Sequence, residues 1–222
     1  MLKENLSKVL SIISDGNNLG EKITLVGATK TQSIETINQA ISYGLKVVGE
    51  NRVQEFNQKN ELVVGASQHF IGHLQTNKVK YLVGKVDLIH SVDSVNLATA
   101  IDQMAKKRQV TQNVLLEVNV SGEASKSGFA LNEIENAVET ISLTLDSVTL
   151  KGLMTMFPLD AKECEIKVYC KAMRSLFDRL KKKYTSFEFL SMGMSNDYQI
   201  AIKNGSNMIR LGRTIFGERG GI

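Results

Sequence analysis

Short apolar runs recur along the chain, and most of them are followed by a longer amphipathic segment. The first run reads ITLVGAT over residues 23–29 and is bounded by polar turns. An apolar run of this length with no polar face is typical of a strand that is covered on both sides. The same pattern predicts further strands at 45–49, 68–72, 86–91, 114–120, 150–156, 187–190 and 208–211.

The segments between these strands repeat their apolar residues at three- and four-residue intervals, which predicts amphipathic helices. Ser33 and Ser94 precede two of them and are expected to cap helices that end at Tyr43 and Lys107. Other helices are expected at 2–14, 53–63, 77–83, 131–143 and 196–203. The longest helix, 161–184, is predicted to bury Ile166, Tyr169, Cys170, Met173, Leu176, Phe177 and Leu180.

Eight strand-then-helix units in one chain of 222 residues favour a closed parallel barrel over an open sheet. An open, doubly wound sheet is the alternative, but no G-x-G-x-x-G turn follows the first strand. The chain has one proline, Pro158, and no stretch with the composition of a linker. We therefore predict an α/β fold made of a single (β/α)8 TIM-barrel domain over residues 1–222.

The charge distribution argues against a nucleic-acid partner. The net charge is +4, and the densest basic runs, 106–108 and 181–183, lie at predicted helix ends, where cations complement the helix dipole. Aromatic residues make up 6% of the chain, which leaves few rings for stacking on bases. We expect no nucleic acid among the partners.

Cysteine usage and the N-terminal segment indicate a cytoplasmic protein. Cys164 and Cys170 lie six residues apart on one predicted helix, which does not place them side by side for a disulfide. The N-terminal segment carries charges throughout and does not resemble a signal peptide. No run of about 18 apolar residues is present, so we expect no membrane association.

Barrel enzymes carry their chemistry at the carboxyl ends of the strands. This rule selects Lys30, a lysine at the end of an apolar strand and hence a candidate nucleophile. It also selects Asn51, His73, Asn119, Met154, 191–195 and 210–214. The last two stretches read SMGMS and RLGRT and precede helical segments, whose first N–H groups bind phosphate. Ordinary turn and capping chemistry is the alternative explanation for both stretches.

A nucleophilic lysine that faces a phosphate site suits a carbonyl cofactor with a phosphate group, and pyridoxal 5′-phosphate has both. Lys30 would take the aldehyde, while Ser195 and Gly212 would help to hold the phosphate. Arg210 would face the ring nitrogen. Because arginine keeps its proton, that nitrogen would stay unprotonated, which weakens the ring as an electron sink and disfavours carbanion chemistry.

Seven stretches of the sequence resemble the pyridoxal phosphate homeostasis proteins, the YggS/PROSC family. They are GATKT (27–31), GENRVQE (49–55), HFIGHLQTNK (69–78), HSVDS (90–94), VNVSGEASKSGF (118–129), KGLMTM (151–156) and LSMGMSNDYQIAIKNGSNMIRLGRTIFG (190–217). The resemblance implies a modified TIM barrel like the alanine racemase N-terminal domain, a fold type III pyridoxal phosphate barrel. It implies that Lys30 holds the cofactor as a Schiff base and that Arg210 faces the ring nitrogen. The other implied contacts are Ser195, Gly212, the Arg213 amide and Thr214 around the phosphate, and Asn51 and Met154 along the cofactor.

The resemblance also implies that the protein buffers or delivers the cofactor in vitamin B6 homeostasis without evident catalysis. Pyridoxal-phosphate-dependent apo-enzymes are then the possible partners, and we expect a monomer. A racemase needs a second base opposite the lysine. Few residues follow the predicted eighth strand, so we do not expect the extra domain that racemases have. The tyrosines all lie on predicted helices, away from the strand ends: Tyr43, Tyr81, Tyr169, Tyr184 and Tyr198.

Two alternative functions remain open at the level of sequence. One is a weak racemase or lyase that uses the same cofactor. The other, less favoured, is a metal-dependent barrel hydrolase built on His69, His73 and His90. The His-x-His pair of such hydrolases is absent after the first strand, and His69 is placed too early in its strand for the three to converge.

Overall fold

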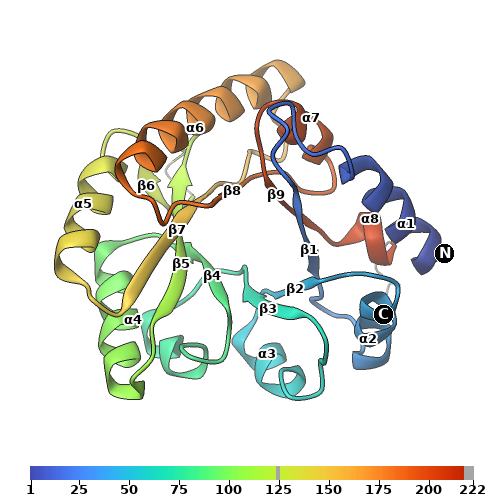
Figure 1. Cartoon of the computed structure of the whole chain (residues 1–222), viewed down its shortest axis with the longest axis horizontal. Helices are drawn as coiled ribbons and strands as arrows, with labels where there is room; N and C mark the ends of the chain where they lie inside the picture. The colour runs from blue at the N-terminus through green and yellow to red at the C-terminus, as the bar shows by residue number, and fades with distance from the viewer. Residues whose placement is uncertain (124–125, 218–222) are drawn as a thin grey trace.

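Parallel strands close into a barrel that is surrounded by helices (Figure 1). The computed structural model describes residues 1–123 and 126–217. Within them, the barrel strands are β1 (Thr24–Ala28), β2 (Val47–Glu50), β3 (Ser67–Phe70), β4 (Leu88–Val92), β5 (Gln112–Asn119), β7 (Val148–Met154), β8 (Phe189–Ser191) and β9 (Met208–Leu211). The sheet runs β4-β3-β2-β1-β9-β8-β7-β5, and pairing of β5 with β4 closes it. The predicted closed barrel is confirmed, and the open sheet is wrong.

The helices lie on the outside of the barrel (Figure 1). Ser33 and Ser94 cap α2 and α4 as predicted, because each hydroxyl oxygen accepts a backbone N–H three residues later, at 3.2 Å. The helices are α1 (Leu2–Ile13), α2 (Ile34–Ser42), α3 (Val53–Lys59), η1 (Thr76–Tyr81), α4 (Val95–Arg108), α5 (Ile134–Thr144), α6 (Glu163–Lys183), α7 (Tyr198–Lys203) and α8 (Arg213–Phe216).

Three local features differ from the prediction. The segment predicted as a helix at 77–83 is the short 3-10 helix η1, in which Val79 is the buried residue. Helix α3 ends at Lys59 rather than near Val63, and the side chain of Gln68 then binds the carbonyl of Asn60 at 2.8 Å. A two-residue strand, β6 (Phe129–Ala130), pairs with β5 and is too short to leave a periodic pattern.

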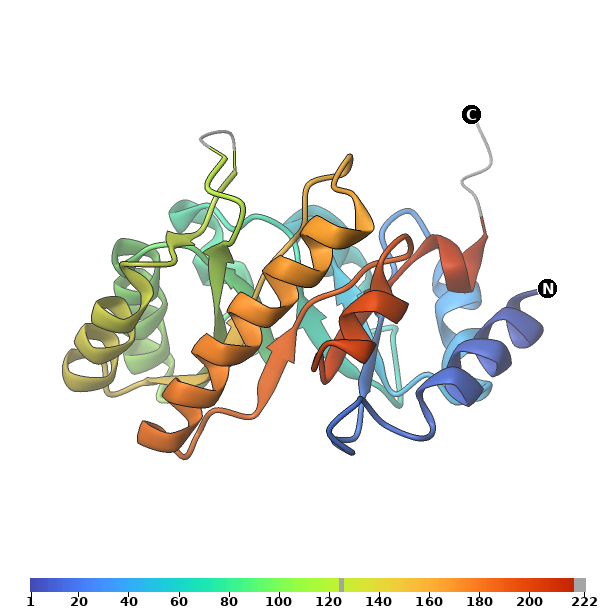
Figure 2. The ribbon, with the colours of Figure 1, turned by 90° about the horizontal axis from the view of Figure 1, so that it is seen from above.

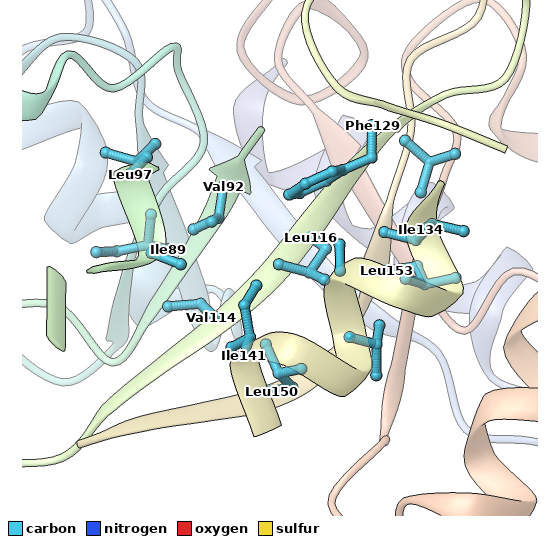
Figure 3. Packing of buried hydrophobic residues seen from close by; sticks show 14 of the residues in the cluster. Ile89, Val92, Leu97, Val114, Leu116, Phe129, Ile134, Ile141, Leu150 and Leu153 are labelled. Atoms are coloured by element: carbon cyan, nitrogen blue, oxygen red, sulfur yellow. The ribbon is translucent and has the colours of Figure 1, made fainter. Parts of the chain in front are cut away.

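The largest apolar core lies between the strands and the outer helices (Figure 3). Leu116 and Leu153 of the sheet pack there with Ile134 and Ile141 of α5, and all four are fully buried. The predicted inner face of α6 is also buried, except that Tyr169 is only half-buried. Each large side chain in this core contributes roughly 2 kcal/mol through burial.

The interior of the barrel changes character along its axis. Its apolar part is a separate cluster that contains Val26, Ile71, Leu88, Leu115, Met154 and Met208. Side chains alternate across a strand, so residues two positions further on point to the same side. His90, Glu117 and Arg210 follow Leu88, Leu115 and Met208 in this way, and all three are buried. The interior is therefore polar and ionisable toward the carboxyl ends of the strands.

A glycine in β7 shapes one wall of the barrel. The register between β5 and β7 shifts where Leu150 pairs with Val114 but Gly152 pairs with Leu115. Gly152 has φ +143°, and a Cβ added to it would lie 1.9 Å from the carbonyl oxygen of Phe189 in β8. Only glycine, which has no Cβ, fits at this position of β7.

The described helices include none that combines the length and apolar content required to cross a bilayer. Cys164 and Cys170 are both free thiols on α6, the first exposed and the second buried. Residues 124–125 of the matched stretch 118–129, and residues 218–222 of the predicted domain, lie outside the described residues.

Candidate functional site

A cavity of about 680 Å³ lies where β1, β2 and β9 end. Figure 2 shows the connection from β7 to α6 and helix α8 along the same edge of the barrel. Six of the eight predicted site residues line the cavity: Lys30, Asn51, Ser195, Arg210, Gly212 and Arg213. The other described lining residues are Ala28, Ile71, Met156, Phe157, Pro158, Leu159, Ala161, Ile166, Met194, Asn196 and Asp197.

Lys30 enters the cavity from the end of β1. It is half-buried and stands two positions beyond Ala28, which also lines the cavity, as strand alternation requires. The next residue, Thr31, has φ +65°. β-branched residues rarely adopt this left-handed conformation, so the backbone directly after the lysine is strained.

Arg210 brings a buried positive charge to the cavity. Its Nη1 donates to the backbone carbonyl of Ser191 at 3.1 Å and to the Ser191 hydroxyl at 2.6 Å. Its Nη2 donates to the carbonyl of Thr155 at 3.0 Å. Burial lowers the pKa of the guanidinium to about 10, against the opposing effect of the Glu117 and Asp197 carboxylates. At neutral pH the group therefore remains a cation held in one orientation.

The loops that follow β8 and β9 meet at one side of the cavity. The Ser195 hydroxyl accepts the Thr214 N–H at 3.4 Å, and Arg213 Nη2 donates to Asn196 Oδ1 at 3.1 Å. Asp197 closes the first loop by accepting the Met194 N–H at 2.6 Å. The Thr214 N–H in the first turn of α8 thus lies beside the hydroxyl of Ser195, so two hydrogen-bonding groups meet where an anion could bind.

The described side chains fit a ligand with polar and anionic groups. Asn51 Oδ1 is buried and accepts no hydrogen bond from the described residues, so it offers an acceptor to a bound molecule. A Cβ added to Gly212 would make only ordinary van der Waals contact with Ala28, at 3.6 Å, so the chain is not tightly packed at this glycine. The described lining contains three cationic side chains, Lys30, Arg210 and Arg213, and one carboxylate, Asp197, so its net charge favours an anion. These features suit pyridoxal phosphate.

Two of the predicted site residues do not line the described cavity. Met154 is 1% exposed and belongs to the apolar cluster inside the barrel, and Thr214 contacts the site through its N–H to Ser195. Their contacts with the cofactor stay predictions. Sequence reasoning missed the connection 156–161, which forms one wall and includes Leu159, 90% exposed. The signal in the sequence that could have indicated this wall is an apolar loop with a proline, directly after a predicted strand.

Two of the three histidines meet inside the barrel, and the prediction that His69 lies too early in its strand is wrong. His69 Nδ1 and His90 Nε2 are 3.0 Å apart, because His69 lies within β3 and faces inward. His73 is elsewhere and lies 3.6 Å from Asp93. No group of three or more potential metal ligands occurs among residues 1–123 and 126–217.

We expect the histidine pair to make the fold sensitive to acid. Burial lowers the pKa of His69 to about 4 and the pKa of His90 well below its ordinary value of 6.5. The unfolded chain therefore binds more protons than the folded chain below pH 6.5, and stability falls as the pH drops from there toward 4. Lowering the pH from 7 to 5 should cost about 2 kcal/mol through His69 alone.

Urea unfolding at pH 7 and pH 5 measures this effect in the wild type, in His73→Asn and in a His69→Asn/His90→Asn double variant. The double variant should lose much less stability on acidification, whereas His73→Asn should match the wild type because His73 is 61% exposed. Burial raises the pKa of Glu117, and this effect acts in the opposite direction in all three proteins. The charge of His73 opposes it as the smallest of the four causes, and only His73→Asn removes that contribution. Equal losses in the three proteins would contradict the prediction.

Comparison with known proteins agrees with this geometry. The family model described as "Alanine racemase, N-terminal domain" matches residues 3–220. A pyridoxal phosphate homeostasis protein of Aquifex aeolicus (strain VF5) is 45% identical to this chain, and the match covers 97% of both chains. The structure of PipY of Synechococcus elongatus PCC7942 with PLP bound is 28% identical, with a TM-score of 0.84 over 98% of this chain and 100% of PipY.

A more distant structure defines the fold. Alanine racemase of Clostridium difficile 630 in complex with cycloserine gives a TM-score of 0.79 at 14% identity, over 99% of this chain and 60% of the racemase. At this identity the likeness shows the barrel alone. The family model and the curated relative together cover nearly the whole sequence. The chain therefore belongs to the alanine racemase N-terminal domain family and, within it, to the pyridoxal phosphate homeostasis proteins.

Proposed function

We propose that this chain binds pyridoxal 5′-phosphate as a Schiff base on Lys30 and acts in vitamin B6 homeostasis. The observation that carries the proposal is one cavity that joins the amine of Lys30, the buried cation of Arg210 and the loops at Ser195 and Gly212. The relatives support it: the Aquifex protein is named for pyridoxal phosphate homeostasis, and PipY was solved with PLP bound.

When bound, pyridoxal phosphate supplies an aldehyde that condenses with an amine and a phosphate that seeks hydrogen-bond donors. Lys30 would provide the amine and Arg210 would face the ring nitrogen. The remaining contacts that we propose are Ser195, Gly212, the Arg213 amide and Thr214 for the phosphate, and Asn51 and Met154 along the cofactor.

We propose that the protein holds the cofactor without catalysing a reaction. Arg210 remains protonated at neutral pH and cannot protonate the ring nitrogen, which keeps the ring a weak electron sink. The described cavity wall contains no tyrosine, and the carboxylate of Asp197 accepts the Met194 N–H. Amino acids incubated with the loaded protein in D₂O should therefore exchange their α-protons no faster than with free cofactor.

Buffering or delivery to pyridoxal-phosphate-dependent apo-enzymes is the role that we propose for the bound cofactor. The free thiols of Cys164 and Cys170 suit a cytoplasmic setting, and we propose a monomer. Mixing the loaded protein with an apo-enzyme and a trap for free cofactor tests direct delivery. If the trap prevents activation of the apo-enzyme, delivery proceeds through free cofactor instead.

Reduction of the loaded protein with borohydride tests the covalent attachment. The Lys30 amine would supply the nitrogen of a C=N bond to the aldehyde, with release of water, and hydride addition would make that link permanent. Digestion and mass spectrometry should then find the phosphopyridoxyl group on the peptide that contains Lys30. A protein that stays colourless with the cofactor, or label spread over surface lysines, would refute the proposal.

A further inference from the structure

The backbone around Lys30 is held from outside the barrel by helix α3. The N–H of Thr31 donates to Glu55 Oε2 at 2.8 Å, and the carbonyl of Thr29 accepts from Lys59 Nζ at 3.1 Å. Glu55 and Lys59 are one turn apart on α3 and are themselves paired at 3.1 Å. The peptide groups before and after Lys30 are therefore both fixed by the same pair of side chains.

The ammonium group of Lys59 has a hydrogen-bond acceptor for each of its three N–H groups. Besides the Thr29 carbonyl and Glu55, its ammonium donates to Glu50 Oε1 at 2.8 Å, so three acceptors match its three N–H groups. The hydroxyl of Thr29 donates to the same oxygen of Glu50 at 2.8 Å. The side chains of Lys59 and Glu50 are only 12% and 6% exposed. A partly buried, hydrogen-bonded ion pair of this kind is rigid compared with a surface pair.

Thr31 has a strained backbone conformation that the hydrogen bonds from α3 can stabilise. A β-branched residue at φ +65° would relax to an ordinary conformation if nothing held it. The bond from its N–H to Glu55 opposes that relaxation. Burial raises the pKa of Glu55, but the Thr31 N–H and Lys59 outweigh it and hold the pKa below its usual range, which keeps the acceptor charged. Rotation at Thr31 would redirect the chain directly after Lys30.

We propose that Glu55 and Lys59 are positioning residues that hold the segment 29–31 in the conformation that presents the Lys30 amine to the cavity. The inference rests on the proposed function, because it assigns a cause to the placement of the lysine that binds the cofactor. Neither residue lines the described cavity. They act on the backbone from the outer side of the barrel, through contacts that do not involve the ligand.

The test compares Glu55→Ala with a matched control, Asp102→Ala. Asp102 pairs with Lys106 one turn further along α4 and accepts the Ser147 N–H at 2.8 Å. It therefore makes the same two kinds of contact as Glu55, one with a lysine of its own helix and one with a backbone N–H. Ser147 lies just before β7, away from the cavity. Glu55→Ala should slow formation of the borohydride-reducible visible band by about tenfold. Without the bond to Glu55, the strained conformation of Thr31 should be populated about ten times less often. It should also speed hydrogen exchange at the Thr31 N–H. Asp102→Ala should do neither.

Two rescue variants separate positioning from general damage. Glu55→Gln keeps an oxygen acceptor for the Thr31 N–H and should recover most of the rate. Thr31→Gly in the Glu55→Ala background should recover part of it, because glycine adopts positive φ without strain. If Glu55→Ala forms the band as fast as Asp102→Ala does, or if neither rescue works, the inference is wrong. If the wild type forms no band, the proposed function fails instead.

Discussion

Replacing Lys30 with alanine is expected to abolish the visible, borohydride-sensitive absorbance of the protein with pyridoxal phosphate. The alanine variant has no amine at the end of β1, whereas Arg210, Ser195 and Gly212 still line the cavity. Residual binding should then be non-covalent and weaker by about a hundredfold or more, which corresponds to about 3 kcal/mol. Absorbance titration and equilibrium dialysis measure the two effects separately.

Lys46→Ala is the matched control for this experiment. Lys46 is an exposed lysine just before β2, at the opposite end of the barrel from the cavity. Its replacement should leave both the absorbance band and the affinity unchanged. Circular dichroism should show that both variants fold. A Lys30→Ala protein that keeps the band would show that another lysine carries the cofactor.

Replacing Gly152 with alanine should destabilise the fold by about 3 kcal/mol or more, because a backbone clash is added to an unfavourable conformation. The new Cβ would lie 1.9 Å from the Phe189 carbonyl oxygen, which belongs to the neighbouring strand and cannot move without breaking the barrel wall. Urea unfolding monitored by circular dichroism measures the loss. In the extreme case the variant accumulates as unfolded or aggregated protein.

Gly20→Ala isolates the conformational part of this cost. Gly20 also has a positive φ, +75°, but a Cβ there would meet no atom within 4 Å. It should therefore lose only about 1 kcal/mol. The difference between the two variants measures the clash together with the greater strain of φ +143° at Gly152. Equal losses would show that the β7–β8 wall yields to the added methyl group.

The features that sequence could predict are those that neighbouring residues determine. The apolar run before Lys30 and the caps Ser33 and Ser94 depend on side chains within a few positions, and the structure contains them as predicted. The order of the units then predicted that these residues share one end of the barrel, and most of the predicted site residues line one cavity there. The barrel rule was sufficient for this step because parallel strands bring their carboxyl ends together.

The features that sequence could not predict depend on contacts between distant segments. The His69–His90 pair requires the inward-facing registers of two strands to match, and neither segment alone shows it. Likewise, Glu55 reaches the Thr31 N–H only because α3 packs against β2, the strand that pairs with β1. The apolar, proline-containing loop 156–161 was visible in the sequence, but its place as a wall of the cavity depends on where α6 begins.

The pairing of β1 with β9 has a consequence for how the protein is made. Thr24 pairs with Met208 and Val26 with Arg210. One edge of the first barrel strand, β1, therefore has no partner strand until the last strand, β9, has been synthesised. Helix α1 likewise binds α8 through Asn5 and the Ile215 carbonyl. On the ribosome, Lys30 emerges long before Arg210 and Gly212, and such non-local pairing is slow to form. We therefore expect the proposed cofactor site to form in one late step, when the two ends of the sheet meet, and a nascent chain that lacks β9 to bind no cofactor.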